Sequence, residues 1–238
     1  LRGLLPFDYL LVLRYDGDQS PAVLGQSGIN ATAEDTLPEY LATAYVMDPV
    51  YTAHLSAKGF GFTPLRELAP DRFRTSSYYR TYYNRTGHGD ELVLLASLAA
   101  GSHLALSLFR REGVRARFAR GEVTHINSLA PVVEALLRKH WGETRARETS
   151  PEGAATADTF PARIARGLHQ RTGAELTERQ SEIIALILRG HSSLSVALNL
   201  DISAETVKVH RRNIYARLGI SSQAELFALA MEILPGGP

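Results

Sequence analysis

Residues 176–234 read LTERQSEIIALILRGHSSLSVALNLDISAETVKVHRRNIYARLGISSQAELFALAMEIL, and this stretch predicts four short consecutive helices. Thr177 and Gln180 form a capping box that begins the first helix, because each side chain can bind the other residue's backbone amide. Gly190 suits the left-handed position that ends it. Three further helices follow over the ranges 193–200, 203–218 and 222–234. The stretch therefore predicts a small all-α module.

The third of these helices has two different faces. Val207, Ile214 and Leu218 fall on one side at about 100° per residue, as a stripe that packs on a scaffold does. Lys208 and Arg212 fall on the opposite half and give the exposed face a positive charge. A short turn before an exposed basic helix is what docking in the DNA major groove requires.

The side chains on this face divide into two predicted roles. Lys and Arg can donate to guanine, and a valine can touch a thymine methyl group, so we predict base contacts by Lys208, Val209 and Arg212. Polar side chains at the edges, helped by the helix amino terminus, can hold backbone phosphates. The predicted phosphate contacts are Ser203, Thr206, His210, Arg211 and Arg217.

Three short motifs carry a family resemblance. Residues 176–179 (LTER), 202–210 (ISAETVKVH) and 218–220 (LGI) resemble the LuxR-type (GerE) helix-turn-helix family. The resemblance implies that residues 223–234 form a dimer interface and that a homodimer binds double-stranded DNA at an inverted-repeat operator. The chain departs from the family at residues 194–196, where Leu, Ser and Val replace the usual Lys or Glu, Glu and Ile.

Two alternatives to this interpretation stay open. The basic face could be an ordinary solvated side of a small helical bundle. A sigma-factor region 4 carries a similar helix-turn-helix, but we expect a core-promoter-binding region before it and find none. DNA binding by a LuxR-type module is therefore the preferred interpretation.

Composition limits the rest of the chain. A length of 238 residues leaves room for two domains, and 45% apolar residues with 21% charged residues are typical of globular protein. The absence of cysteine excludes disulfides, thiol nucleophiles and iron–sulfur clusters and fits a cytoplasmic protein. No apolar run is long enough to span a membrane, so we expect no membrane partner.

The amino-terminal part predicts an α+β sensor domain, an antiparallel sheet with flanking helices that is GAF-like or PAS-like. Apolar and turn residues predict strands over 9–15 and 22–25 and two more strands within 91–110. Helical spacing predicts helices over 36–47, 77–85 and 119–141, and Pro49 closes the first of them. The stretch from Gly142 to Asp158 has no apolar period and predicts a linker. The predicted domains are a sensor at 1–141, a linker at 142–162 and a helix-turn-helix domain at 163–238.

Aromatic residues in this part suggest a small-molecule effector. Asp48-Pro49 resembles the Asp-Pro element of lactone receptors, but the tryptophan those receptors place before it is missing, so a GAF-like domain for another ligand fits better. Aromatic walls with one carboxylate suit a cationic or amphipathic molecule. The predicted ligand contacts are Tyr40, Tyr45, Asp48, Tyr51, Phe62, Tyr78 and Tyr82. The alternative is that these tyrosines are ordinary core and Asp48 a turn former.

The residues that other classes of sensor domain require are missing from this sequence. A phosphoacceptor receiver needs an aspartate after its third strand, and an ATPase needs a glycine-rich loop ending in Lys-Ser or Lys-Thr; neither is present. The histidines show no metal-ligand spacing, and no catalytic triad can be assigned, so we predict no metal, cofactor or enzymatic activity. A ligand-independent dimerisation or protein-docking module remains the alternative to a ligand sensor.

Overall fold

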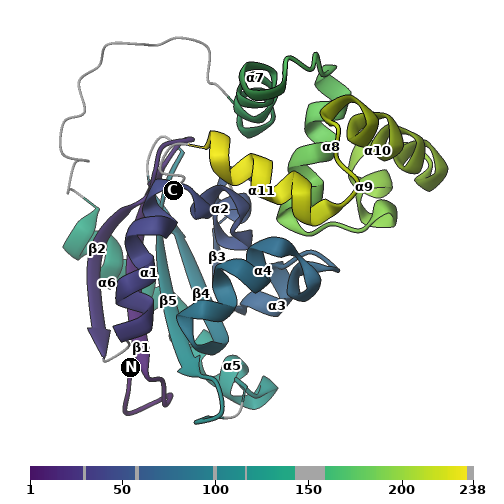
Figure 1. Ribbon diagram of the computed structural model, residues 1–238. Coiled ribbons are helices and arrows are strands. Elements are labelled where there is room, and N and C mark those ends of the chain that lie inside the picture. Colours follow the sequence, from purple (N-terminus) through teal and green to yellow (C-terminus); the bar gives the residue numbers. More distant parts are fainter. Residues whose placement is uncertain (29–30, 57–58, 99–100, 116, 143–158, 235–238) are drawn as a thin grey trace, which may run out of the picture. The chain divides into compact units, whose positions relative to one another are not determined.

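The structure is a computed structural model, shown in Figure 1, that describes residues 1–28, 31–56, 59–98, 101–115, 117–142 and 159–234. Most of the predicted linker lies outside the described residues. The chain divides into two compact units. Unit 1 comprises residues 1–41, 48–69 and 85–154, and unit 2 comprises residues 42–47, 70–84 and 155–238.

Unit 1 is built on one five-stranded antiparallel sheet in the order β2-β1-β5-β4-β3, as Figure 1 shows. The strands are β1 (Tyr9–Asp16), β2 (Ala22–Gly28), β3 (Phe60–Pro64), β4 (His88–Ser97) and β5 (Ser102–Arg111). The predicted antiparallel sheet is confirmed, and the predicted strands form two antiparallel pairs, β1 with β2 and β4 with β5. Strand β3 was not predicted, because its sequence FGFTP has glycine and proline in place of an alternating apolar pattern.

One face of the sheet is covered by α5 (Arg120–Asn127) and α6 (Ala130–Trp141). The prediction of a single helix over 119–141 is wrong, because Pro131 lies in the first turn of α6, where its missing amide is tolerated, and a new helix begins there. The two helices enclose an apolar core with Leu92 and Leu106 of the sheet. Phe62 of β3 belongs to this core.

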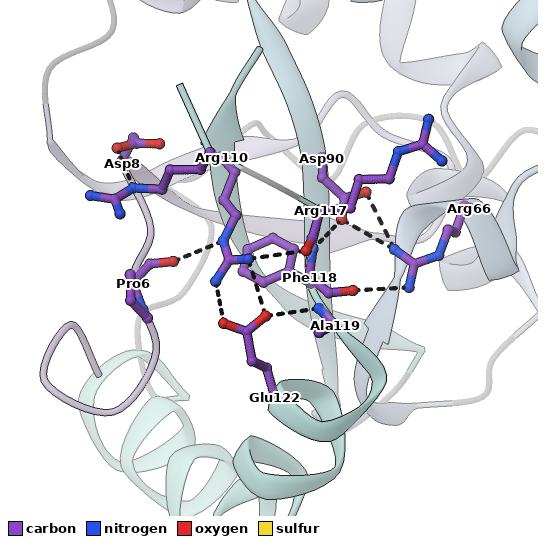
Figure 2. A network of polar contacts seen from close by, with 10 residues as sticks. Pro6, Asp8, Arg66, Asp90, Arg110, Arg117, Phe118, Ala119 and Glu122 are labelled. Carbon is purple, nitrogen blue, oxygen red and sulfur yellow. Dashed lines mark hydrogen bonds and ion pairs between the residues drawn. The ribbon is translucent and has the colours of Figure 1, made fainter. Parts of the chain in front are cut away.

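A charged network surrounds Phe118, which is a residue of that core, as Figure 2 shows. The Arg110 guanidinium pairs with Glu122 (Nη2–Oε1, 2.7 Å) and lies over the Phe118 ring at 4.1 Å. Asp90 accepts from Arg66 Nη1 at 3.1 Å and from the Phe118 amide at 2.8 Å. Each buried charge here has a charged partner, as burial requires.

The other face of the sheet receives side chains of α1 (Ala31–Ala42) and α2 (Pro49–Leu55), while α3 (Leu65–Leu68) follows β3. The predicted helix over 36–47 is shifted, since α1 ends at Ala42 and a 3-10 turn covers Ala44–Met47. Pro49 does not only follow this helical stretch but also begins α2, which Asp48 caps by accepting the Val50 amide at 2.7 Å. Asp48 is thereby fixed at a helix start beside the sheet.

Unit 2 contains the predicted helical module. Its helices are α4 (Ser77–Thr81), α7 (Phe160–Thr172), α8 (Glu178–Arg189), α9 (Ser193–Leu200), α10 (Ala204–Leu218) and α11 (Gln223–Ile233). The capping box at Thr177 and Gln180 is confirmed, and Gly190 is left-handed as predicted. Gly219, which ends α10, is left-handed as well. Among the described residues, no helix combines the length and apolar character that a bilayer crossing requires.

Candidate nucleic-acid interface and buried tyrosine cluster

Helix α10 is held so that one side faces away from unit 2. Ser203 begins it by accepting the Thr206 amide at 3.0 Å, and a left-handed Gly219 ends it. Val207 and Ile214 are fully buried against the neighbouring helices. The opposite side of the same helix therefore points to solvent.

The three predicted base contacts all lie on that outward side. Lys208 and Arg212 are exposed, and Val209 keeps 46% of its surface accessible, although it is apolar. Lys208 Nζ lies 2.7 Å from Glu205 Oε1, but both groups are exposed, so this pair is worth little and can open. The face presents two cations and an apolar group between them.

Most of the predicted phosphate contacts lie at the edges of this face. Arg211 Nη1 donates to Ser193 Oγ at 3.2 Å, which ties the start of α9 to α10, and Arg217 Nη1 donates to the Glu175 carbonyl at 2.6 Å. Thr206 is exposed and His210 is half-buried. The Ser203 hydroxyl lies in the helix cap, 2.8 Å from the Thr206 hydroxyl.

The departure from the family sequence has a visible result on α9. Val196 is buried, but Leu194 is 64% exposed, and Leu198 one turn later is 76% exposed. An exposed leucine thus stands at position 194, where the family usually has Lys or Glu, and Leu198 extends this apolar surface. The departure at 194–196 was the sequence signal for Leu194 but not for Leu198.

A buried polar cluster lies on the α1 and α2 side of the sheet in unit 1. The hydroxyls of Tyr15 and Tyr40 are 2.8 Å apart, and Tyr40 donates to Asp48 Oδ2 at 2.8 Å. Desolvation raises the pKa of Asp48 to about 6, although hydrogen bonds from Val50 and Tyr40 act to lower it. Desolvation, and then the nearby Asp48 charge, raise the pKa of Tyr15 well above its ordinary value. The side chains of Tyr15, Tyr40 and Asp48 thus form a buried series of hydrogen bonds that ends at the Asp48 carboxylate.

Two histidines extend this cluster. His54 Nε2 lies 2.7 Å from the Gly17 carbonyl, which can only accept, so His54 donates there. When both rings are neutral, His54 Nδ1 must then accept from His103 Nδ1, 2.8 Å away. His103 Nε2 is left buried and, within the described part of the chain, without a hydrogen-bond partner. Desolvation lowers the pKa of both rings, which favours the neutral forms.

The structure brings together only some of the predicted ligand contacts. Tyr40 and Asp48 are bonded to each other, and Tyr51 packs beside Tyr15 with ring centroids 5.9 Å apart. Phe62 instead lies in the apolar core on the opposite face of the sheet. The remaining three are buried residues of unit 2, namely Tyr45, Tyr78 and Tyr82. Sequence analysis missed Tyr15, His54 and His103, which are adjacent only because β1 pairs with β5 and α2 packs on both.

Comparison with known proteins identifies the helical module. Residues 174–230 match the GerE family, described as bacterial regulatory proteins of the luxR family. An HTH-type transcriptional regulator of the exeN 3' region in Aeromonas salmonicida is 27% identical over 191 residues, which is 80% of this chain and 96% of that protein. The regulator MalT of Yersinia pestis is 37% identical over 59 residues, but these are 25% of this chain and only 6% of MalT.

A solved structure resembles the chain as well. The VqsR LBD domain from Pseudomonas aeruginosa shares 27% identity and a TM-score of 0.50, covering 58% of this chain and 79% of that one. The fold and the exposed basic helix thus define a DNA-binding transcription regulator with an α+β amino-terminal domain. More particularly, residues 174–230 form a GerE domain of the luxR family of bacterial regulatory proteins.

Proposed function

We propose that the chain is a cytoplasmic, non-enzymatic transcription regulator that binds inverted-repeat operators as a homodimer and responds to a small molecule. The observation that supports a ligand response is the buried Tyr15–Tyr40–Asp48 cluster, in a chain with likeness to the VqsR LBD domain. A ligand that binds this cluster changes the sensor's preferred conformation and thereby the presentation of two α10 helices to DNA half-sites. Ligand affinity and DNA affinity are then reciprocally linked.

On the DNA side, we propose that Lys208, Val209 and Arg212 contact bases. The exposed cationic face of α10 supports this assignment. The test compares Arg212→Ala with Arg211→Ala on a duplex selected from a random library and on a random duplex. R212A should lose about 1 to 3 kcal/mol of discrimination at one base position, whereas R211A should weaken both duplexes alike. Equal losses on both duplexes for both variants would contradict the division into base and phosphate contacts.

On the ligand side, we propose that Tyr40 and Asp48 hold the polar end of a cationic or amphipathic effector. A cationic donor could replace Tyr40 as the partner of Asp48 Oδ2 and remove the cost of a desolvated carboxylate. The test is a thermal-shift screen of the full chain against small metabolites and lactones. A hit should raise the midpoint of the wild type and of Asp35→Asn, an exposed control, but not of Asp48→Ala.

A second candidate function is a ligand-independent dimerisation or protein-docking module. It is favoured by the way Tyr15, Tyr40 and Asp48 already satisfy one another's hydrogen bonds. A broad library that gives no midpoint shift, together with a dimer that persists without added ligand, supports this candidate. The assignment of the GerE domain to DNA binding is the same in both cases.

A further inference from the structure

Within unit 2, the segment that precedes α4 lies against the turn between α8 and α9. Asp71 Oδ1 accepts the Ser192 amide at 3.0 Å, and the Arg72 amide donates to the Gly190 carbonyl at 3.1 Å. These bonds join residues about 120 positions apart in the sequence. The turn is therefore clamped by a segment that is not part of the GerE domain at 174–230.

The packing around these bonds is close. Gly190 has a φ of +96°, and a Cβ atom there would lie 3.1 Å from both Phe73 Cα and Ser76 Cβ. A second peptide segment of unit 2 also reaches α8, because Arg189 Nε donates to the Val46 carbonyl at 3.2 Å. Backbone bonds and tight packing together make this a specific contact and not a passing approach of two surfaces.

The contact is placed at a point where DNA would bind. The first helix of a helix-turn-helix crosses the DNA backbone, and the amide groups at a helix amino end bind phosphate. Ser192 caps α9, and the next residue, Ser193, accepts from Arg211, one of the predicted phosphate contacts. The Asp71 carboxylate thus puts an anion beside the cationic edge of the proposed DNA surface.

The charge on Asp71 is maintained. Desolvation acts to raise the pKa of Asp71, but hydrogen bonds from the Ser192 side chain and amide and the nearby His191 lower it below the ordinary value. The carboxylate is therefore ionised at neutral pH. An ionised carboxylate both occupies the amide and repels a phosphate that approaches it.

We infer that residues 70–76 form an autoinhibitory clamp, in which Asp71 competes with a DNA phosphate for the amino end of α9. DNA binding must displace the clamp or proceed without that phosphate contact. Any signal that withdraws residues 70–76 therefore increases DNA affinity without changing the base-reading face of α10. The clamp is independent of whether the chain binds a small molecule.

The test is the affinity of the full chain for a fluorescein-labelled random-sequence DNA duplex, in which phosphate contacts dominate. Asp71→Ala should bind about threefold to tenfold more tightly than the wild type. Glu67→Ala removes the same charge from an exposed position of α3 and should stay within about twofold of the wild type. Affinity of D71A equal to that of E67A, or weaker than the wild type in a folded protein, overturns the inference.

A second variant and a second measurement guard against a folding defect in D71A. Asp71→Asn keeps the size of the side chain and an acceptor for Ser192, and should show a smaller gain in affinity in the same assay. In the wild type, hydrogen exchange of the Arg72 amide should become faster when the duplex is added, because its bond to the Gly190 carbonyl opens. Exchange that is unchanged or slower at that amide contradicts the clamp.

Discussion

The raised pKa of Asp48 predicts that the stability of unit 1 falls as the pH rises from about 4 to about 6. Desolvation raises this pKa from 3.8 to about 6 in the folded chain. The folded state therefore binds the proton more tightly than the unfolded state, and stability decreases with pH between the two values. A shift of about 2 pKa units corresponds to about 3 kcal/mol, which is the largest loss we expect.

The perturbation is Asp48→Asn, which removes the titrating group and keeps an acceptor for the Val50 amide. The difference in free energy of unfolding between D48N and the wild type should rise by about 2 to 3 kcal/mol from about pH 4 to about pH 7. Urea unfolding followed by tryptophan fluorescence measures this, because Trp141 is the chain's only tryptophan and belongs to unit 1.

A matched control has the opposite sign. Desolvation acts to raise the pKa of Asp16, but the hydrogen bond from Arg14 and other interactions lower it overall. Its contribution to stability is present above the unfolded pKa and is lost as the pH falls, so Asp16→Asn should cost most near neutral pH. Parallel pH profiles for the wild type and D48N would refute the reasoning about Asp48.

Four further substitutions test the packing, the helix ends and the buried ion pair. Gly219→Ala forces a left-handed alanine into open space and should lower the free energy of unfolding by about 1 kcal/mol, measured by circular dichroism. Gly190→Ala should cost at least about 1 kcal/mol more, because the added Cβ atom is crowded there. Ser203→Ala removes the cap of α10 and should lower both stability, by about 1 kcal/mol, and DNA affinity in a fluorescence anisotropy titration. Glu122→Gln leaves the buried Arg110 without its carboxylate partner and should lower the free energy of unfolding, followed by Trp141 fluorescence, by about 1 to 3 kcal/mol. No loss would mean that the ion pair in Figure 2 contributes nothing to stability.

Local signals predicted the helical module well. The boundaries of α8 and α10 follow from Thr177, Ser203 and two glycines, each of which acts within one helical turn of its own position. The same locality explains why the buried stripe of α10 was correct, since helical period alone places Val207, Ile214 and Leu218 on one side. The roles of the outward residues remain predictions.

Long-range pairing was the part that the sequence could not supply. Tyr15 lies opposite His103 because β1 pairs with β5 across almost 90 residues, and no local pattern fixes that register. The i, i+4 spacing of Tyr78 and Tyr82 places their rings in a stack, with centroids 5.6 Å apart. Local spacing could not tell that β3 directs Phe62 to the opposite face of the sheet from Tyr40.

The position of Asp48 in the chain suggests how the buried cluster could influence DNA binding. Asp48 accepts a hydrogen bond from Tyr40 in unit 1, and the residues that precede it, 42–47, belong to unit 2. Within unit 2, the Val46 carbonyl accepts a hydrogen bond from Arg189 at the end of α8. A change in the charge of Asp48 therefore acts one peptide bond away from a segment that contacts the GerE domain. If this continuity couples the two, the ratio of DNA affinities at about pH 5 and about pH 7.5 should differ between the wild type and D48N. All groups other than residue 48 are common to both proteins, so their contributions cancel in that comparison. Identical ratios would show that the cluster and the DNA-binding helices are energetically independent.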